Sequence, residues 1–136
     1  MPSAPLPISL LPPHQMQWKR ATKLSPNFKL GEFIKPNTPM PDDIILWNLW
    51  LLAQRLQALR DILNRPITIT SGFRTPEQNK AIGGHPLSYH LRGMAADIVV
   101  ASLTPKQVQQ KLAQWQGGLG CYPTFTHIDI GPKRRF

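Results

Sequence analysis

Residues 88–100 read SYHLRGMAADIVV, so that His90, Gly93 and Asp97 follow one another closely just as an apolar run begins. The apolar run predicts a strand from Ala95 to Ala101. Gly93 permits a reversal of the chain ahead of this strand, because glycine tolerates positive φ. Asp97 is the exception within the run, since burying an unpaired carboxylate is costly. We therefore expect Asp97 to belong to a polar site.

A second polar interruption comes thirty residues after Asp97, where His127 and Asp129 lie in a strand predicted over residues 125–130. Side chains alternate along a strand, so Asp97 and His127 face one cavity if the two strands are adjacent and antiparallel. His90 then enters the cavity from the preceding loop. Two neutral imidazoles and one carboxylate suit Zn²⁺, and three protein ligands leave a fourth position for water. The residues predict a small zinc hydrolase.

The other elements are predicted from hydrophobic periodicity and from helix-end signals. A long helix is expected over residues 42–64, a strand over 67–70, a short helix over 76–81, and a second amphipathic helix from Thr104 to about Gly117. The predicted core stripe of the long helix consists of Ile45, Leu49, Leu52, Leu56, Leu59 and Leu63, widened by Ile44, Leu51 and Ile62. This order of elements predicts an α+β fold, in which a small antiparallel sheet packs against the long helix and shorter helices.

Length and composition indicate one soluble globular domain. The chain has 136 residues, of which 41% are hydrophobic, and five prolines among the first thirteen residues argue against regular structure there. We expect a proline-rich arm over residues 1–23 and the folded domain over 24–136. The single cysteine, Cys121, excludes an intramolecular disulfide framework. We expect it to be a buried small hydrophobe, with zinc ligation as the alternative.

The net charge of +9 favours polyanionic surroundings. Nucleic acid and bacterial cell wall both qualify. The basic residues are scattered apart from Lys133-Arg134-Arg135, and no nucleic-acid-binding signature accompanies them. We therefore expect no specific nucleic-acid partner. A basic nucleic-acid binder remains an alternative, and it rests on charge alone. Neither a signal peptide nor a membrane span is predicted, so the product is expected to be soluble and cytoplasmic as synthesised.

Three ordered motifs carry a resemblance to a known family. Residues 88–97 contain Ser-x-His-x-x-Gly-x-Ala-x-Asp, residues 71–74 read SGFR, and residues 118–131 read GLGCYPTFTHIDIG. Together they resemble the zinc D-Ala-D-Ala carboxypeptidases, and more distantly the vancomycin-resistance D,D-dipeptidases, phage L-alanyl-D-glutamate endolysins and the Hedgehog signalling domain. The resemblance spans roughly residues 24–136 and implies the corresponding fold.

The resemblance implies zinc held by His90, Asp97 and His127, with water as the fourth ligand and a peptidoglycan stem peptide or cross-link as the substrate. Zinc lowers the pKa of such water to about 7, and hydroxide then attacks a peptide carbonyl. Arg74 is the candidate to stabilise the oxyanion or to grip a substrate carboxylate. Ser88 is expected near the substrate, or it organises the turn. Action at the cell wall without a signal peptide suits a phage lysis or tail enzyme.

The general base is where the sequence departs from the dipeptidase pattern. Those relatives place a glutamate three residues before the last zinc histidine, and Thr124 occupies that position here. Asp129 is the best replacement, but it could instead orient His127. The departure leaves a non-catalytic, zinc-stabilised wall-binding or phage structural module as an alternative. His85 is expected to be a loop residue and not a ligand. The sequence leaves open the bond that is cut, carboxypeptidase versus endopeptidase action, and the oligomeric state.

Overall fold

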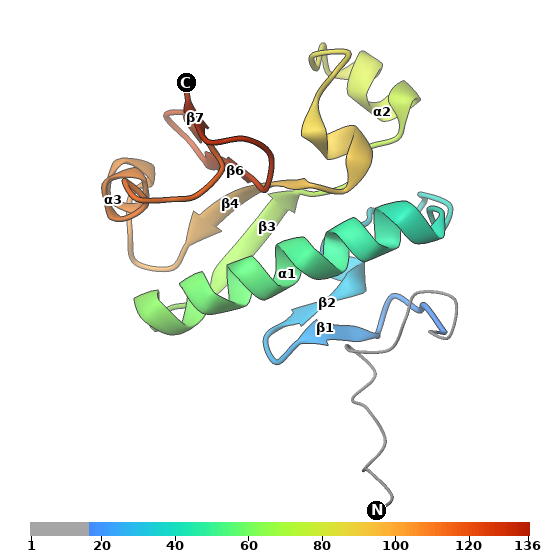
Figure 1. Cartoon of the computed structure of the whole chain (residues 1–136), viewed down its shortest axis with the longest axis horizontal. Coiled ribbons are helices and arrows are strands. Elements are labelled where there is room, and N and C mark those ends of the chain that lie inside the picture. The colour runs from blue at the N-terminus through green and yellow to red at the C-terminus, as the bar shows by residue number, and fades with distance from the viewer. Residues whose placement is uncertain (1–16) are drawn as a thin grey trace, which may run out of the picture.

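The computed structural model describes residues 17–136, which form an α+β domain (Figure 1). The elements in chain order are β1 (Lys23–Ser25), β2 (Phe28–Lys29), η3 (Leu30–Glu32), α1 (Asp43–Leu63), β3 (Ile67–Ser71), α2 (Pro76–Ala81), η4 (Tyr89–Arg92), β4 (Ala95–Val100), α3 (Pro105–Lys111), β5 (Gly118–Cys121), β6 (Thr126–Asp129) and β7 (Arg134–Arg135). Most of the predicted proline-rich arm, residues 1–16, lies outside the described residues. None of the helices in residues 17–136 has both the length and the apolarity that crossing a membrane requires.

α1 is the long helix that the sequence predicts, with the expected ends. The Asp42 side chain accepts a hydrogen bond from the Ile45 N–H at 3.0 Å, which satisfies one of the free donors of the first turn. Asn64 ends the helix in the left-handed region, with φ of 51°. One face is buried, and its members are Leu46, Leu49, Leu52, Ala53, Leu56, Gln57 and Leu59.

The widened apolar stripe predicted for this helix is wrong. Ile44 and Ile62 are 75% and 80% exposed, and Leu51 is 37% exposed. At 3.6 residues per turn, all three lie roughly 140–160° around the helix from the buried Leu49. They therefore form the face turned away from the core.

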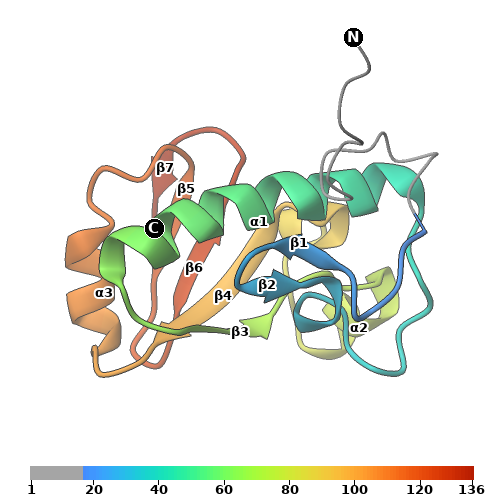
Figure 2. The ribbon, with the colours of Figure 1, turned by 90° about the horizontal axis from the view of Figure 1, so that it is seen from below.

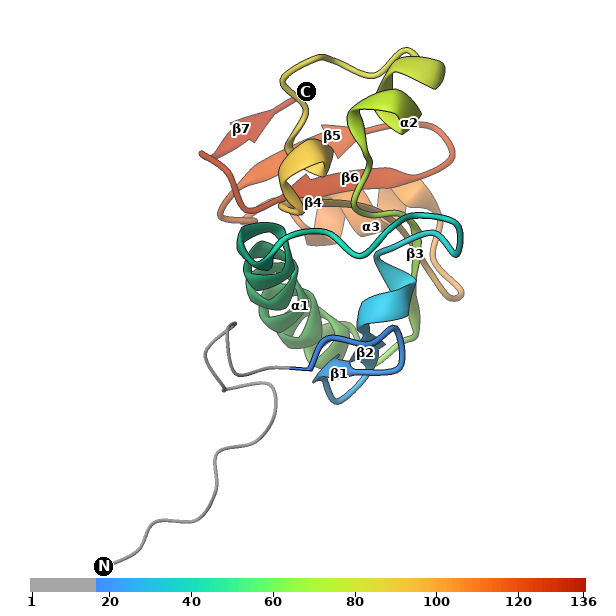
Figure 3. The same cartoon turned by 90° about the vertical axis from the view of Figure 1, so that its right-hand side faces the viewer.

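The five-stranded sheet has the order β3-β4-β6-β5-β7, and β4 pairs antiparallel with both β3 and β6. The predicted adjacency of the two site strands is thus confirmed, with Asp97 directly opposite His127. Ala96, Ile98 and Ile128 alternate with these residues and belong to the core cluster. In Figure 3, α1 and α3 lie on one side of the sheet, whereas η4 and α2 lie on the other. The two faces of the sheet therefore separate the core from the site.

The β1–β2 hairpin packs against α1 (Figure 2), on the side of the helix away from the sheet in Figure 1. Leu24 and Phe28 of the hairpin are fully buried or nearly so. The Gln57 side chain binds Asn27 through two 2.8 Å hydrogen bonds, one to its backbone N–H and one to its amide oxygen. α1 is therefore held between the hairpin and the sheet that carries the site.

Three features differ from the expectation. α3 ends at Lys111 and not near Gly117, and the following residues form turns. β5 and β7 were not predicted, because the glycines of β5 give no strand signal. At Gly120 the Phe136 ring packs against the backbone, where a Cβ would lie 2.5 Å from it. Cys121 is exposed at the end of β5, so the expectation of a buried residue is wrong.

Candidate metal centre

Three side chains from different elements meet on the face of the sheet that bears η4. The Asp97 Oδ1 atom lies 3.2 Å from His90 Nε2 and 3.0 Å from His127 Nδ1. One ligand atom from each residue lies within 4.8 Å of the others, and the three residues are only 2–9% exposed. The predicted ligand set is thus brought together at one point.

The turn through η4 places His90. The Ser88 hydroxyl accepts a hydrogen bond from the His90 N–H at 3.2 Å, and this contact organises the turn. Gly93 ends η4 with φ of +68°, in the left-handed region expected of it. A Cβ at Gly93 would also lie 2.9 Å from the Ile45 backbone oxygen, so the turn packs directly against α1.

Buried acceptors set the tautomers of both histidines. His90 Nδ1 lies 2.6 Å from the carbonyl oxygen of Gly72, and because a carbonyl only accepts, Nδ1 carries the proton. His127 Nε2 lies 2.8 Å from Asp129 Oδ2 and donates to that carboxylate. In the neutral rings, His90 Nε2 and His127 Nδ1 are therefore lone-pair donors aimed at Asp97. A histidine that binds a metal usually donates its other ring N–H to a carboxylate or a backbone carbonyl, as both histidines do here.

Three lone-pair atoms pointing at one another need a positive charge between them, either a cation or added protons. Burial opposes ionisation of Asp97, but hydrogen bonds with His127 and then His90 outweigh it and hold the pKa of Asp97 at about 2. Burial likewise disfavours the charged form of His127, yet its hydrogen bonds to Asp129 and Asp97 raise its pKa. Two imidazoles and a carboxylate with these orientations fit the donor preferences of zinc.

Asp129 lies behind His127 and is fully buried. Besides the His127 contact, its oxygens accept hydrogen bonds from the backbone N–H groups of Gly118 and Gly131, both at 3.0 Å, and from the Arg134 guanidinium. Burial would raise the pKa of Asp129, but the hydrogen bonds from His127 and Arg134 lower it to about 2. The contact that an orienting role requires is therefore present.

Arg74 points into the site from the loop after β3. Its Nη2 donates to Asp97 Oδ2 at 3.1 Å, and its Nε donates to Ser71 Oγ at 3.1 Å. The Arg74 backbone N–H donates to the His90 carbonyl at 3.0 Å, which ties this loop to η4. Gly72 must lack a side chain here, because a Cβ would lie 2.5 Å from the Phe33 carbonyl oxygen. The SGFR motif thus supplies both the partner of His90 and the guanidinium.

The triad opens into a cavity of about 810 Å³. Its wall contains charged, aromatic and loop residues, namely Arg74, Ile82, Gly83, Gly84, His85, Leu87, Ser88, Tyr89, His90, Arg92, Asp97, Tyr122, Phe125, His127, Arg134 and Phe136. His85 lines the mouth, where its Nδ1 accepts from the Leu87 N–H at 3.0 Å, and it is not a member of the triad. A cavity of this size admits a short peptide beside the triad.

A family model described as Peptidase M15 matches residues 26–129 of this chain. The chain belongs to the peptidase M15 family. Membership indicates a peptidase and bears out the resemblance drawn from the three motifs. No curated protein sequence matches the chain.

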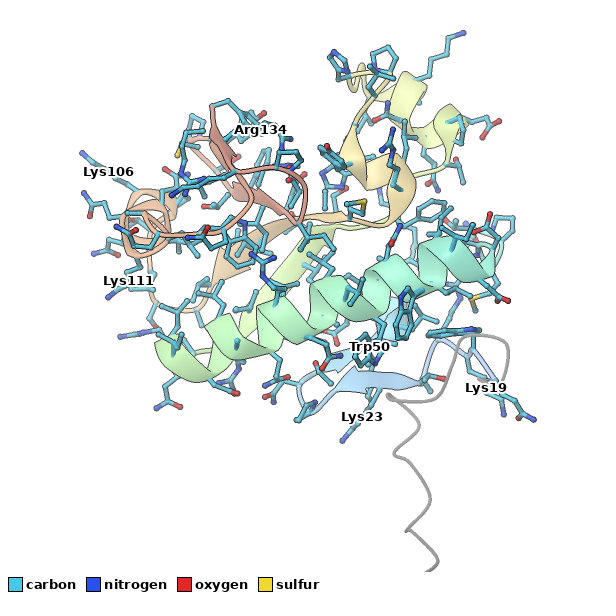
Figure 4. The ribbon with its side chains drawn as sticks, viewed as in Figure 1. Lys19, Lys23, Trp50, Lys106, Lys111 and Arg134 are labelled. Atoms are coloured by element: carbon cyan, nitrogen blue, oxygen red, sulfur yellow. The ribbon has the colours of Figure 1, made fainter. Side chains whose placement is uncertain are left out.

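The M15 match contains the triad and each of the other predicted site residues, Arg74, Ser88 and Asp129. It ends before Arg134, which the sequence had presented only as part of a short basic run. The structure places Arg134 on β7, on the side of the sheet that faces η4 (Figure 4). Its signal in the sequence is indirect: the Gly131-Pro132 turn directly after Asp129 brings the chain back beside the site. Thr124 is exposed and does not line the cavity.

Proposed function

We propose that this M15 protein is a zinc metallopeptidase that hydrolyses peptide bonds in peptidoglycan stem peptides or cross-links, and that it acts at the bacterial cell wall. The convergence of His90, Asp97 and His127 in one cavity is the observation that carries the proposal. Family membership supports peptide hydrolysis over other zinc-assisted hydrolyses. The net charge of +9 suits an anionic wall.

His90, Asp97 and His127 would hold the zinc ion, which supplies a water of lowered pKa, and hence hydroxide at neutral pH, next to a polarised carbonyl. The Gly72 carbonyl and Asp129 keep the two rings in the tautomers that this binding requires. We assign Asp129 to orienting His127, because five hydrogen bonds already occupy its oxygens and no part of it is exposed.

Arg74 is proposed to bind the substrate from the β3 side of the triad. Its guanidinium keeps N–H donors beyond those that bind Ser71, Asn79 and Asp97. They would stabilise the negative charge that develops on the carbonyl oxygen, or bind a carboxylate of the peptide. The hydroxyl hydrogen of Ser88 remains able to donate into the cavity, which Ser88 also lines.

One observation favours the second candidate, a zinc-stabilised binding module without catalysis. Within residues 17–136, Asp97 is the sole acidic side chain in the cavity wall, and it belongs to the triad. A general base of the kind that the dipeptidases place at the position of Thr124 is therefore not found there. Both candidates bind zinc, so only turnover separates them.

The test is digestion of purified sacculi and of a synthetic stem pentapeptide by protein loaded with one equivalent of zinc. We expect product masses that report a single type of cleaved peptide bond. Cleavage should stop with a chelator, return with added zinc, and be absent for His90→Ala. Zinc binding without cleavage of either substrate would reject the peptidase and leave the binding module.

A further inference from the structure

Two guanidinium groups gather on one aromatic ring at the mouth of the cavity. The Cζ atoms of Arg134 and Arg92 lie 4.9 and 5.6 Å from the centre of the Tyr89 ring. All three residues line the cavity wall. Attraction to the ring face offsets part of the repulsion between the two cations. Gly131 packs against the same ring, since a Cβ there would lie 2.7 Å from it.

Both guanidiniums keep donors that no described residue accepts. An arginine side chain has five N–H donors. Arg134 uses its two Nη groups on Asp129 and on the Pro132 carbonyl, so that Nε–H and one Nη2–H remain. For Arg92, no side-chain hydrogen bond or ion pair is formed with any residue from 17 to 136. Its charge therefore has no counter-charge within this part of the chain.

The cluster formed by Tyr89, Arg92 and Arg134 lies on the opposite side of the triad from Arg74. Arg74 follows β3 and contacts Asp97, whereas Arg134 lies on β7 and contacts Asp129. β3 and β7 are the two edges of the sheet, and the strands that carry Asp97 and His127 lie between them. Among the described residues, the cavity wall holds three arginines against one acidic side chain, Asp97. A substrate bound across the triad thus meets positive charge at both ends.

We propose that Arg92 and Arg134, held together by Tyr89, form a subsite for a carboxylate of the substrate. The inference rests on the proposed function and narrows it: the substrate is an acidic peptide with a free carboxylate on the side of the scissile bond away from Arg74. Bidentate binding of a carboxylate by a guanidinium is directional. The subsite should therefore discriminate a carboxylate from the carboxamide that has nearly the same shape.

The test compares a synthetic stem pentapeptide with two derivatives, one amidated at the D-glutamyl α-carboxylate and one at the free carboxylate of its diaminopimelyl residue. Kinetics give KM and kcat on zinc-loaded protein. Calorimetry with versions whose amide bonds resist cleavage gives affinity without turnover. We expect one of the two amidations to weaken binding of the peptide about ten-fold, which is typical of the loss of a charge-assisted hydrogen bond. Arg92→Gln should reduce that discrimination to about two-fold, mainly through KM.

Lys106→Gln is the control, because it removes one exposed positive charge on α3, far from η4 in Figure 4. It should retain the full discrimination. The inference is overturned if neither amidation weakens binding, or if Arg92→Gln discriminates as well as the unchanged protein. Cleavage without discrimination rejects this subsite alone. Discriminating binding without cleavage rejects the peptidase and keeps the subsite.

Discussion

Arg134 and Asp129 form a bidentate ion pair directly behind His127. Nη1 lies 3.0 Å from Oδ1 and Nη2 lies 2.8 Å from Oδ2, while Oδ2 also accepts from His127. The Asp129 carboxylate is fully buried, whereas the side chain of Arg134 is 40% exposed. The last strand of the sheet, which carries Arg134, therefore supports the geometry of His127 through Asp129.

Replacing Arg134 should weaken zinc binding although Arg134 does not contact the ion. Arg134→Gln removes two hydrogen bonds that fix the orientation of the Asp129 carboxylate, so the carboxylate positions the His127 ring less precisely. We expect about a 10–100-fold loss of zinc affinity, the usual cost of losing such support. Competition with a chromogenic chelator measures it. Lys133 is an exposed neighbour whose side chain forms no hydrogen bond or ion pair with the described residues, so Lys133→Gln should bind zinc normally. Unchanged affinity in Arg134→Gln would rule out the support.

Asp129→Asn separates the two roles that the sequence left open. If Asp129 orients His127, as we propose, the variant loses zinc affinity by about 10–100-fold, and turnover falls with zinc occupancy. If Asp129 were the general base, turnover would fall by orders of magnitude in protein that still binds one zinc ion tightly. Zinc content and kcat, measured on the same samples, distinguish these outcomes.

The sequence was sufficient to predict those parts of the fold that have local signals. Thr75-Pro76 and Thr104-Pro105 predict the starts of α2 and α3, and in both the threonine and a glutamine three residues later form a capping box. β7 has only two residues and pairs with β5 through contacts distant in sequence. No local pattern marks such a strand.

The same distinction applies to the site. Asp97 and His127 could be predicted because polar residues within apolar strands need partners, and His90 because it lies just before the strand of Asp97, across the Gly93 turn. The contact of Asp129 with His127 was among the alternatives that the sequence offered. The outer contact of His90 could not be predicted, because its partner is the backbone carbonyl of Gly72, whose position depends on how Gly72 packs against Phe33. Backbone groups carry no residue identity, so a sequence pattern does not show which of them a side chain will bind.

Zinc affinity should fall as the pH is lowered, and the fall should begin above pH 6.5. Zinc needs the neutral ring of His127, but hydrogen bonds to Asp129 and Asp97 raise the pKa of this ring above its usual 6.5 in the metal-free chain. Protons therefore compete with zinc at a higher pH than for an ordinary histidine. Chelator competition between pH 5.5 and 8.5 measures the curve. The exposed His85→Gln should follow it unchanged, and a flat affinity down to pH 6 would contradict it.

The two faces of α1 should respond differently to truncation. Leu56 is fully buried, so Leu56→Ala should lower the free energy of unfolding by about 2–5 kcal/mol through lost contacts and the cavity left behind. Ile62 is 80% exposed, and Ile62→Ala should change the free energy of unfolding by no more than about 0.5 kcal/mol. Urea unfolding of the whole chain, with chelator present so that zinc does not contribute, measures both. Similar losses for the two variants would mean that the face bearing Ile62 is buried in solution, as the apolar pattern alone had predicted.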